Sequence, residues 1–371
     1  MKTPKELFAE HATRIQGAVS LKKTDRVPVV LFVDSFCARH QHVKMADFCN
    51  SPELACDTMV NSITSLGEID GIEHVLIDPR LMSVAMLCDV LLPGRDLPVD
   101  SPWQVSENGK MTLDDFDTII NNGWELVAAD ILTNRLADKT VLQGFERAVQ
   151  YIPAAIQKWA DKGVVPFCPL VTNAPFDDLS MARGMAPFYK DLYKHGSKID
   201  EVLKIRTALA KETVQNMIRQ THAPGVFIGC SRSASQFISR KFFERFAWPY
   251  MKDMIETIVA EGAYAYMHCD SNWDRDLDLF RDLPKGRCVM SSDSATNIYK
   301  MKELLDGHMC LMGDVPPSLL TLGTPDEVHA HCVKRIREIG PTGYILSQSC
   351  TIPTEAKPEN VAAMIAAAKD A

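Results

Sequence analysis

The chain has 371 residues and a formal net charge of −8, and 46% of its residues are hydrophobic while 24% are charged. These values are ordinary for a soluble globular chain with a large core, and the length fits one large barrel or two ordinary domains. No basic stripe of Lys and Arg appears, which argues against a nucleic-acid partner, and no apolar run reaches the length of a membrane span.

The opening stretch, MKTPKELFAEHATRI, is amphipathic and contains acids. It has the features of neither a secretory signal nor a transit peptide, so we expect a cytoplasmic protein. The eleven cysteines are scattered without the spacing of a disulfide framework. In the cytoplasm they should mostly be reduced, and either buried or bound to a metal.

Short apolar runs alternate with longer amphipathic runs along the chain. Alternating strands and helices imply parallel pairing and right-handed crossovers, and eight such units predict a (β/α)8 TIM barrel of the α/β class. The expected strands are Val27–Asp34, Ile72–Asp78, Val164–Leu170, Gly225–Cys230, Ala263–Cys269, Arg287–Asp293, Met309–Asp314 and Gly343–Gln348. The expected helices are Pro52–Leu66, Gly144–Lys162, Lys198–Gln220, Lys241–Glu261, Trp273–Asp282, Ile298–Asp306, Pro325–Gly340 and Pro358–Lys369.

A long insertion, from about Arg80 to Asp138, separates the second and third expected strands. It contains VLLPGRDLPVDSPWQVSENGKMTL, which predicts a hairpin with turns at Gly and Asn. We expect residues 1–371 to form a single barrel domain, with this insertion over one end of the barrel and shaping access for a substrate.

Polar or reactive side chains stand at the C-terminal ends of the expected strands, the face where this fold carries its active sites. Strands also commonly end in Asp or Ser because turns follow. That simpler explanation has much weight for Asp34, Asp78 and Asp314, but it explains His268 and Cys350 less well. The residues at these ends are Asp34, Asp78, Cys230, His268, Asp270, Asp293, Asp314 and Cys350.

His268, Asp270 and Cys350 offer an imidazole, a carboxylate and a thiolate, which are all zinc ligands, and a catalytic zinc uses three protein ligands and one open position. Cys269 competes with Asp270 for the second ligand position. Because neighbouring strand residues point to opposite faces, Asp270 is favoured if His268 faces the barrel interior. A bulge at the strand end would reverse this.

The chain is similar to the uroporphyrinogen decarboxylase superfamily over nearly its whole length. KELFAEHATRIQGAVSLKKTDRVPVV resembles the family's opening helix and its Asp-Arg-Val-Pro-Val strand. The segments APFDDLSMARGMAPFYKDLYKHGSKIDEVLKI and SRKFFERFAWPYMKDMIE resemble helices after the third and fourth strands. The strongest resemblance lies in LMGDVPPSLLTLGTPDEVHAHC and GPTGYILSQSCTIPTEAKPENVAAMIAAAK, although Gly-Asp-Val-Pro-Pro replaces the family's usual Gly-Asn-Val-Asp-Pro.

The superfamily has two functional branches. True decarboxylases share an N-terminal Arg-Gln-Ala-Gly-Arg loop that grips the porphyrinogen carboxylates, and residues 32–40 here read FVDSFCARH instead. The cobamide-dependent methyltransferases have a His-x-Cys zinc motif and a distant Cys in a Gly-Cys-x-x-Pro context. His268, Asp270 and Cys350 occupy the three matching positions, with Asp270 replacing the middle Cys and Ser349 replacing the Gly.

The resemblance therefore implies a zinc-dependent methyltransferase that moves a methyl group between a small oxygen-linked donor and the cobalt of a corrinoid on a separate protein. A carboxylate in place of one thiolate makes a zinc centre harder and more Lewis-acidic, which suits the oxygen of a methyl ether or an alcohol. Asp293, on the adjacent strand, is the expected catalytic residue and would orient the substrate or a metal ligand. The alternative is that Asp293 is a turn residue.

Two other functions stay open. A carboxy-lyase acting on a porphyrin or another acid would need cationic side chains that bind the carboxylates of the substrate. For this role the sequence offers only the scattered Arg183, Arg232 and Arg240. A non-catalytic barrel that binds a corrinoid or its carrier protein would need no zinc. The presence of Asp270 where the family has its middle Cys is also compatible with weak zinc binding or with no zinc binding.

Overall fold

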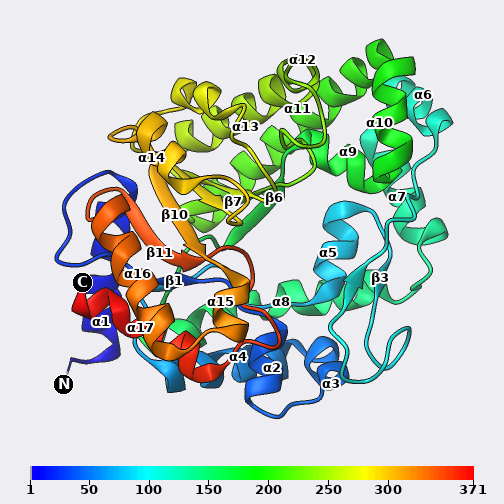
Figure 1. Cartoon of the computed structure of the whole chain (residues 1–371). Coiled ribbons are helices and arrows are strands. Elements are labelled where there is room, and N and C mark those ends of the chain that lie inside the picture. The colour runs from blue at the N-terminus through cyan, green and yellow to red at the C-terminus, as the bar shows by residue number, and fades with distance from the viewer. Residues whose placement is uncertain (1) are drawn as a thin grey trace.

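The structure, a computed structural model, describes residues 2–371 and has a barrel of parallel strands surrounded by helices (Figure 1). This confirms the predicted α/β class and TIM-barrel fold. Every predicted strand overlaps an observed one, although the second, Ile72–Asp78, shares only Ile72 with β2. The third contains β5 and the start of β6. The barrel strands are β1 (Val30–Leu31), β2 (Gly71–Ile72), β5 (Val165–Pro166), β6 (Leu170–Asn173), β7 (Gly225–Cys230), β8 (Tyr264–Cys269), β9 (Cys288–Ser292), β10 (Cys310–Val315) and β11 (Tyr344–Gln348).

The strand pairings run around the whole barrel. One sheet has the order β1-β2-β5 and another the order β11-β10-β9-β8-β7-β6. Residues 165–173 join them, because β5 pairs with β2 while β6 pairs with β7. The last and first strands meet at a parallel bridge between Val29 and Leu346, where the Leu346 amide donates to the Pro28 carbonyl at 2.9 Å.

The third barrel strand is split because of proline. Pro169 lies between β5 and β6 and has no amide hydrogen, so it cannot donate to a neighbouring strand. The predicted strand ended at Leu170, whereas the observed one continues to Asn173 after this interruption.

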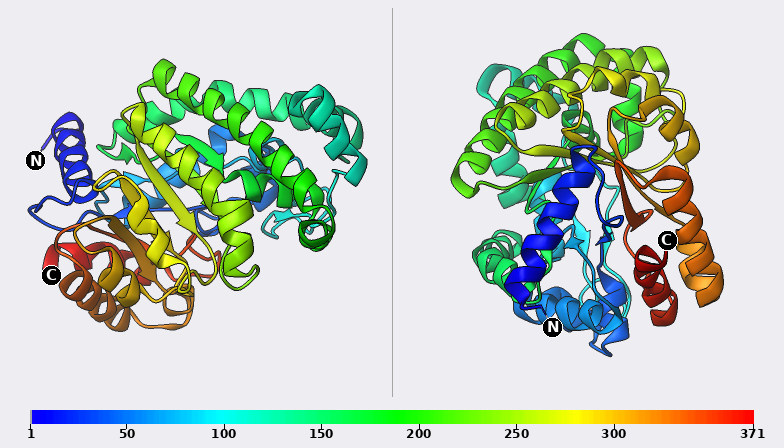
Figure 2. Two further views of the ribbon diagram at one scale, coloured as in Figure 1. Left: turned by 90° about the horizontal axis from the view of Figure 1, so that it is seen from above. Right: turned by 90° about the vertical axis from the view of Figure 1, so that its left-hand side faces the viewer.

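Helices cover the outside of the barrel, and the two labelled chain ends lie on the same side of the molecule (Figures 1 and 2). None of the helices within residues 2–371 is both long and apolar enough to cross a membrane. The helices are α1 (Pro4–Val19), α2 (Ser35–His40), α3 (Met45–Asn50), α4 (Pro52–Leu66), α5 (Pro79–Met86), α6 (Leu113–Asn122), α7 (Trp124–Asp130), α8 (Val141–Ala160), α9 (Pro175–Arg183), α10 (Met185–Lys194), α11 (Gly196–Thr221), α12 (Arg240–Phe242), α13 (Trp248–Ala260), α14 (Ile298–Leu305), α15 (Pro317–Leu322), α16 (Pro325–Ile339) and α17 (Pro358–Asp370). Two π-helical turns, η1 (Ile131–Arg135) and η2 (Phe243–Ala247), and one 3-10 helix, η3 (Leu277–Asp282), complete the set.

The predicted helix over Trp273–Asp282 is wrong in its first half. Residues 273–276 form a turn, and only Leu277–Asp282 is helical, as a 3-10 helix. The Asn272 side chain accepts a hydrogen bond from the Asp274 amide at 3.1 Å, and the Thr296 hydroxyl accepts one from the Trp273 amide at 2.9 Å. Such side-chain bonds to the backbone compete with helix formation.

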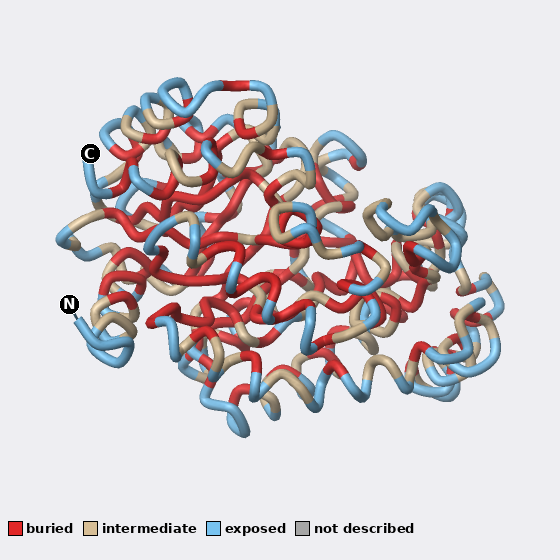
Figure 3. Tube along the Cα trace, turned by 90° about the horizontal axis from the view of Figure 1, so that it is seen from below, coloured by how far each residue is buried: buried red, intermediate tan, exposed pale blue. Residues whose placement is uncertain are grey.

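The strand side chains divide into two cores, inside and outside the barrel, and Figure 3 shows the buried chain at the centre of the fold. On β8, Ala265, Met267 and Cys269 belong to the core between barrel and helices, whereas Tyr266 belongs to the core inside the barrel. This is the alternation expected of a strand. It places His268 on the same face as Tyr266.

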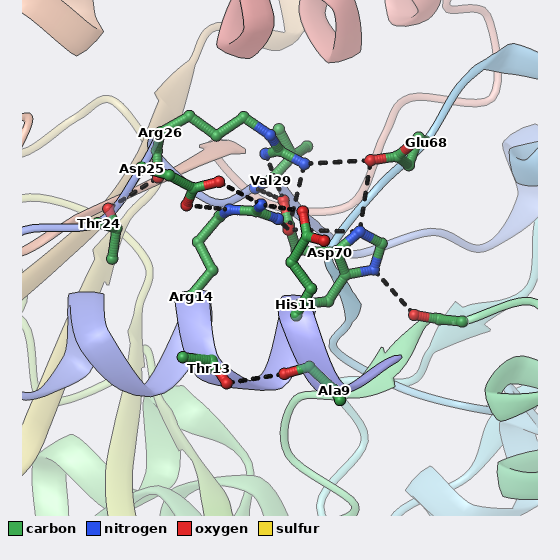
Figure 4. Close-up of polar contacts among 12 residues, drawn as sticks. Ala9, His11, Thr13, Arg14, Thr24, Asp25, Arg26, Val29, Glu68 and Asp70 are labelled. Carbon is green, nitrogen blue, oxygen red and sulfur yellow. Dashed lines mark hydrogen bonds and ion pairs between the residues drawn. The ribbon is translucent and has the colours of Figure 1, made fainter. Parts of the chain in front are cut away.

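Helix α1 closes the N-terminal end of the barrel (Figure 2). Its residues Ile15, Ala18 and Val19 join the core inside the barrel. Beside this helix, Asp70 has no exposed surface and accepts hydrogen bonds from Arg14, from Arg26 at 2.6 Å and from the Val29 amide at 2.8 Å (Figure 4). This network of charges anchors α1 to the first two strands.

The insertion between β2 and β5 contains the predicted hairpin, with β3 (Val90–Leu91) antiparallel to β4 (Gln104–Val105), but most of its ordered residues are helical in α5, α6 and α7. The Trp103 indole donates to Asp34 at 2.9 Å, and Arg232 donates to Glu107 at 2.5 Å. Asp34 and Arg232 follow β1 and β7, so the hairpin lies against the carboxyl ends of both strands. That it controls substrate access, and that the whole chain acts as one domain, stay predictions.

Candidate metal centre

Three predicted ligands meet at the carboxyl end of the barrel. His268 is the fifth residue of β8, Asp270 follows that strand directly, and Cys350 lies two residues beyond the end of β11. Their ligand atoms all lie within 4.8 Å of one another. Residues 80 positions apart in sequence therefore converge because the barrel brings both strand ends to one rim.

The Nε2 atom of His268 is the buried centre of this group. It lies 3.3 Å from Oδ1 of Asp270 and forms no hydrogen bond with any described residue. Burial opposes a charged imidazole, but Asp270 and Cys350 outweigh burial and raise the pKa of His268 well above its usual value. The three side chains therefore favour a positive charge beside Nε2.

Strand register separates Asp270 from Cys269. The Cys269 side chain is buried in the core between barrel and helices, and its backbone pairs with Cys230. The Asp270 amide still donates to the Cys230 carbonyl at 3.1 Å, so the strand geometry continues to Asp270 without a bulge. Asp270 consequently returns to the face of His268, as the alternation rule predicts.

Cys350 differs from the other cysteines in exposure. All eleven are free thiols, and Cys350 alone is not buried. The preceding Ser349, which stands where the related methyltransferases have Gly, donates through its amide and its hydroxyl to the Val315 carbonyl, at 3.1 and 3.0 Å. Ser349 thus fixes the turn that presents Cys350.

Asp293 lies outside this group of ligand atoms, and its carboxylate accepts hydrogen bonds from the backbone of two turns. Its Oδ2 accepts from the Ser271 amide at 2.6 Å, and its Oδ1 accepts from the Ala295 amide at 2.9 Å. Ser271 directly follows Asp270 and has a left-handed φ of 71°, a strained conformation for a residue with a side chain. These contacts favour the alternative that Asp293 is a turn residue that holds the Asp270 segment.

The other polar strand ends have partners away from the three ligands. Asp78 pairs with Arg80 at 2.8 Å, Asp314 pairs with Arg335 at 2.9 Å, and Cys230 belongs to the helix-facing core. Asp34 accepts from Trp103, and burial raises the pKa of Asp34 to about 6. The structural explanation therefore accounts for Asp78, Asp314 and Cys230, whereas Oδ1 of Asp34 is buried and has no hydrogen-bond partner among the described residues.

The sequence reasoning missed a buried acid beside the site. Glu73 follows β2, is 2% exposed, and accepts a hydrogen bond from the Tyr266 hydroxyl at 3.0 Å. The same hydroxyl lies 3.2 Å from Nδ1 of His268. Burial raises the pKa of Glu73 to about 7. The sequence signal for this residue was a Glu within the run GIEHVLI, where only Glu73 and His74 are not apolar.

Aromatic rings surround the imidazole on its other sides. Phe227 stacks on His268 with ring centres 5.4 Å apart, and Phe32 meets it edge-on at 5.7 Å. His74 packs against both phenyl rings, at 4.7 Å from Phe32 and 4.8 Å from Phe227. Burial, and then the neighbouring His268, lower the pKa of His74 to about 3, so this second imidazole is uncharged.

The residues fit a zinc ion by the chemistry of their atoms. Nε2 is buried, has no hydrogen-bond partner among residues 2–371, and faces a carboxylate and a thiol. A metal cation there would replace the proton that these neighbours favour, and would bind the Nε2 lone pair. One imidazole, one carboxylate and one thiolate satisfy the three protein positions of a catalytic zinc and leave a fourth open.

Comparison with known proteins agrees with this architecture. A solved structure described as a methyltransferase from Methanosarcina mazei superposes with a TM-score of 0.71 at 18% identity, covering 100% of this chain and 99% of its own. At that identity the likeness shows the shared fold.

Sequence relatives extend over nearly the full chain. Uroporphyrinogen decarboxylases of Chlorobaculum parvum and Chlorobaculum tepidum are each 20% identical, over 95% of this chain and 96% of their own length. Residues 127–371 match the family model described as Uroporphyrinogen decarboxylase (URO-D). The chain belongs to the uroporphyrinogen decarboxylase (URO-D) family.

Proposed function

We propose that this protein is a zinc-dependent methyltransferase that passes a methyl group from a small oxygen-linked donor to the cobalt of a corrinoid held by a separate protein. The observation that carries the proposal is the convergence of His268, Asp270 and Cys350 around the unpartnered Nε2 atom. The family and the methyltransferase neighbour support an enzyme of this general kind.

The three ligands have distinct tasks in this proposal. Zinc held by them would supply Lewis acidity to the donor oxygen at the open position. Cys350 would contribute the single thiolate, and Asp270 would contribute a hard oxygen that keeps the centre electron-poor. In the proposed transfer, the bond between the methyl carbon and oxygen would break with its electron pair staying on oxygen, and the corrinoid on the separate protein would supply the electron pair that accepts the methyl group.

The surrounding rings have a supporting task. Phe32, His74 and Phe227 bury one side of His268 and exclude water from it. Because His74 is uncharged, it adds no positive charge that would compete with a metal cation. Charge interactions at the ligands are stronger in such a low-dielectric setting than in water.

Metal content measured beside methyl transfer tests the proposal. The purified protein should hold about one zinc per chain and should methylate cob(I)alamin from a methyl ether or methanol. Cys350→Ala should lose zinc and transfer together. Asp270→Cys should bind zinc more tightly but transfer more slowly, since a second thiolate reduces Lewis acidity. A wild-type protein free of zinc, with normal transfer, would refute the assignment.

A carboxy-lyase is the second candidate, because the curated relatives are described as uroporphyrinogen decarboxylases. The arginines available as carboxylate grips already pair with acids of the protein itself: Arg183 with Asp191, Arg232 with Glu107, and Arg240 with Asp278. We therefore expect no coproporphyrinogen from uroporphyrinogen in an anaerobic assay. Its appearance would favour the lyase, whereas a corrinoid-binding barrel without catalysis would show neither reaction.

The remaining parts of the proposal concern partners and location. The partners are a corrinoid protein and a small-molecule methyl donor or acceptor, and the location is the cytoplasm. Co-purification of a corrinoid protein, and the methyl donor that supports transfer to it, would test the partner and the substrate together.

A further inference from the structure

Glu73 is a buried carboxylate without a cationic partner. It is 2% exposed, and it forms no ion pair with any Lys or Arg of residues 2–371. An isolated buried charge is costly unless hydrogen bonds or an opposite charge compensate for it. Among the described residues, its one side-chain hydrogen bond leads, through Tyr266, to His268 and the group of ligands around it.

Tyr266 connects Glu73 to that group. Its hydroxyl donates to Oε2 of Glu73 at 3.0 Å and lies 3.2 Å from Nδ1 of His268. Tyr266 has no exposed surface, so water cannot replace these contacts. The alternation of β8 explains the arrangement, because Tyr266 and His268 are two residues apart and share the interior face.

The direction of the hydrogen bonds follows from the acceptor. The Tyr266 hydroxyl donates its proton to Oε2 of Glu73, so the Tyr266 oxygen is left to accept. Nδ1 of His268 is then the donor toward Tyr266, its nearer partner, while the Ser291 hydroxyl lies farther from it, at 3.4 Å. A neutral imidazole with its proton on Nδ1 has its lone pair on Nε2, the atom that faces Asp270 and Cys350.

We propose that Glu73 and Tyr266 are positioning residues that hold His268 with its proton on Nδ1 and direct its Nε2 lone pair to the metal. This inference rests on the proposed function in one respect, namely that His268 binds zinc. The carboxylate polarises the chain of hydrogen bonds and makes Nε2 a stronger ligand, as outer partners of ligating histidines generally do.

Zinc affinity measured with a competing chelator tests the inference. Tyr266→Phe keeps the ring but removes the acceptor for Nδ1, and Glu73→Gln keeps the shape but removes the charge. Each should weaken zinc binding about 10-fold to 100-fold, the usual effect of losing such a partner. Tyr264→Phe is the matched control: its hydroxyl, on the same strand, donates to the Phe167 carbonyl instead, so zinc affinity should stay at the wild-type value.

Nitrogen NMR of zinc-loaded protein labelled at histidine gives a readout that a purely structural role would not move. The wild type should show His268 with a protonated Nδ1 and a metal-bound Nε2, assigned by loss of its signals in His268→Ala. In Tyr266→Phe the Nδ1 proton should shift upfield, because it loses its acceptor. The wild-type spectrum keeps the test decisive even if a variant fails to fold.

The outcomes separate this inference from the proposed function. Zinc bound through Nδ1, or both variants binding zinc as tightly as wild type, would overturn the positioning role and leave the zinc site intact. Wild-type protein that binds no zinc would overturn both.

Discussion

Cys269 and Asp270 are sequence neighbours, yet their side chains lie on opposite sides of the barrel wall. Cys269 lies in the core against the helices, and Asp270 lies within 4.8 Å of the His268 and Cys350 ligand atoms. A shift of register by one residue would exchange their places.

The first prediction compares these two neighbours. Asp270→Ala should lose most of the bound zinc, because a three-ligand site is left with two ligands. Cys269→Ala should retain zinc and methyl transfer, and should lower the free energy of unfolding by only about 1 kcal/mol, as expected for a small change in the core. Metal analysis of both variants checks this, and the reverse pattern would place Cys269 at the metal.

The second prediction concerns Asp293. Asp293→Ala removes the acceptor of the Ser271 amide, in the turn that follows Asp270, and the acceptor of the Ala295 amide, so zinc affinity should fall about 10-fold. Asp293→Asn keeps one acceptor oxygen and should fall less. Chelator competition and transfer kinetics measure the two effects separately. A loss of kcat in Asp293→Asn at unchanged zinc affinity would instead make Asp293 a group that acts on the substrate.

The third prediction concerns the anchor of α1. Asp70→Asn removes a fully buried charge that Arg14 and Arg26 share, while Arg14 keeps its pairs with Glu10 and Asp25. The change should cost about 2–3 kcal/mol of unfolding free energy, as expected for the loss of charged hydrogen bonds. The matched control is Asp57→Asn, which breaks an exposed pair with Lys158 and should cost about 0–1 kcal/mol. Urea denaturation compares them, and equal losses would contradict the prediction.

The fourth prediction concerns pH and Asp34. Burial raises the pKa of Asp34 from 3.8 to about 6, so the folded state favours the neutral acid. Its stabilising contribution is full below pH 3.8 and is lost as pH rises through about 6. Asp34→Asn is neutral throughout and should gain about 3 kcal/mol relative to wild type between those limits. Calorimetry of both proteins from pH 4 to 7 measures this difference in unfolding free energy. A difference that stays constant over this range would mean that Asp34 stays ionised, and would contradict the prediction.

The sequence predicted the barrel well because strand and helix periodicities differ strongly. Gly225–Cys230 and Pro52–Leu66 appear with the predicted bounds. Local chemistry caused the errors: Pro169 interrupts the third strand, and side-chain hydrogen bonds replace the first half of the helix predicted from Trp273.

The site was predictable in part. Alternation along one strand was enough to place Asp270, and not Cys269, on the face of His268, and the barrel rule was enough to bring Cys350 beside them. Glu73 could not be assigned, because its meaning depends on a contact with Tyr266, 193 residues away. No periodicity within either strand encodes which residue of another strand it will meet.

The closure of the N-terminal end of the barrel by α1 has a consequence for the order in which partners would bind. Since Ile15, Ala18 and Val19 fill one end of the barrel, molecules can reach His268 only from the opposite rim. Under the proposed function, a methyl donor and a bulky carrier protein would then both approach through this rim of the barrel. In that case a docked carrier would cover the path of the small donor, so the donor would bind before the carrier and its demethylated product would leave after it.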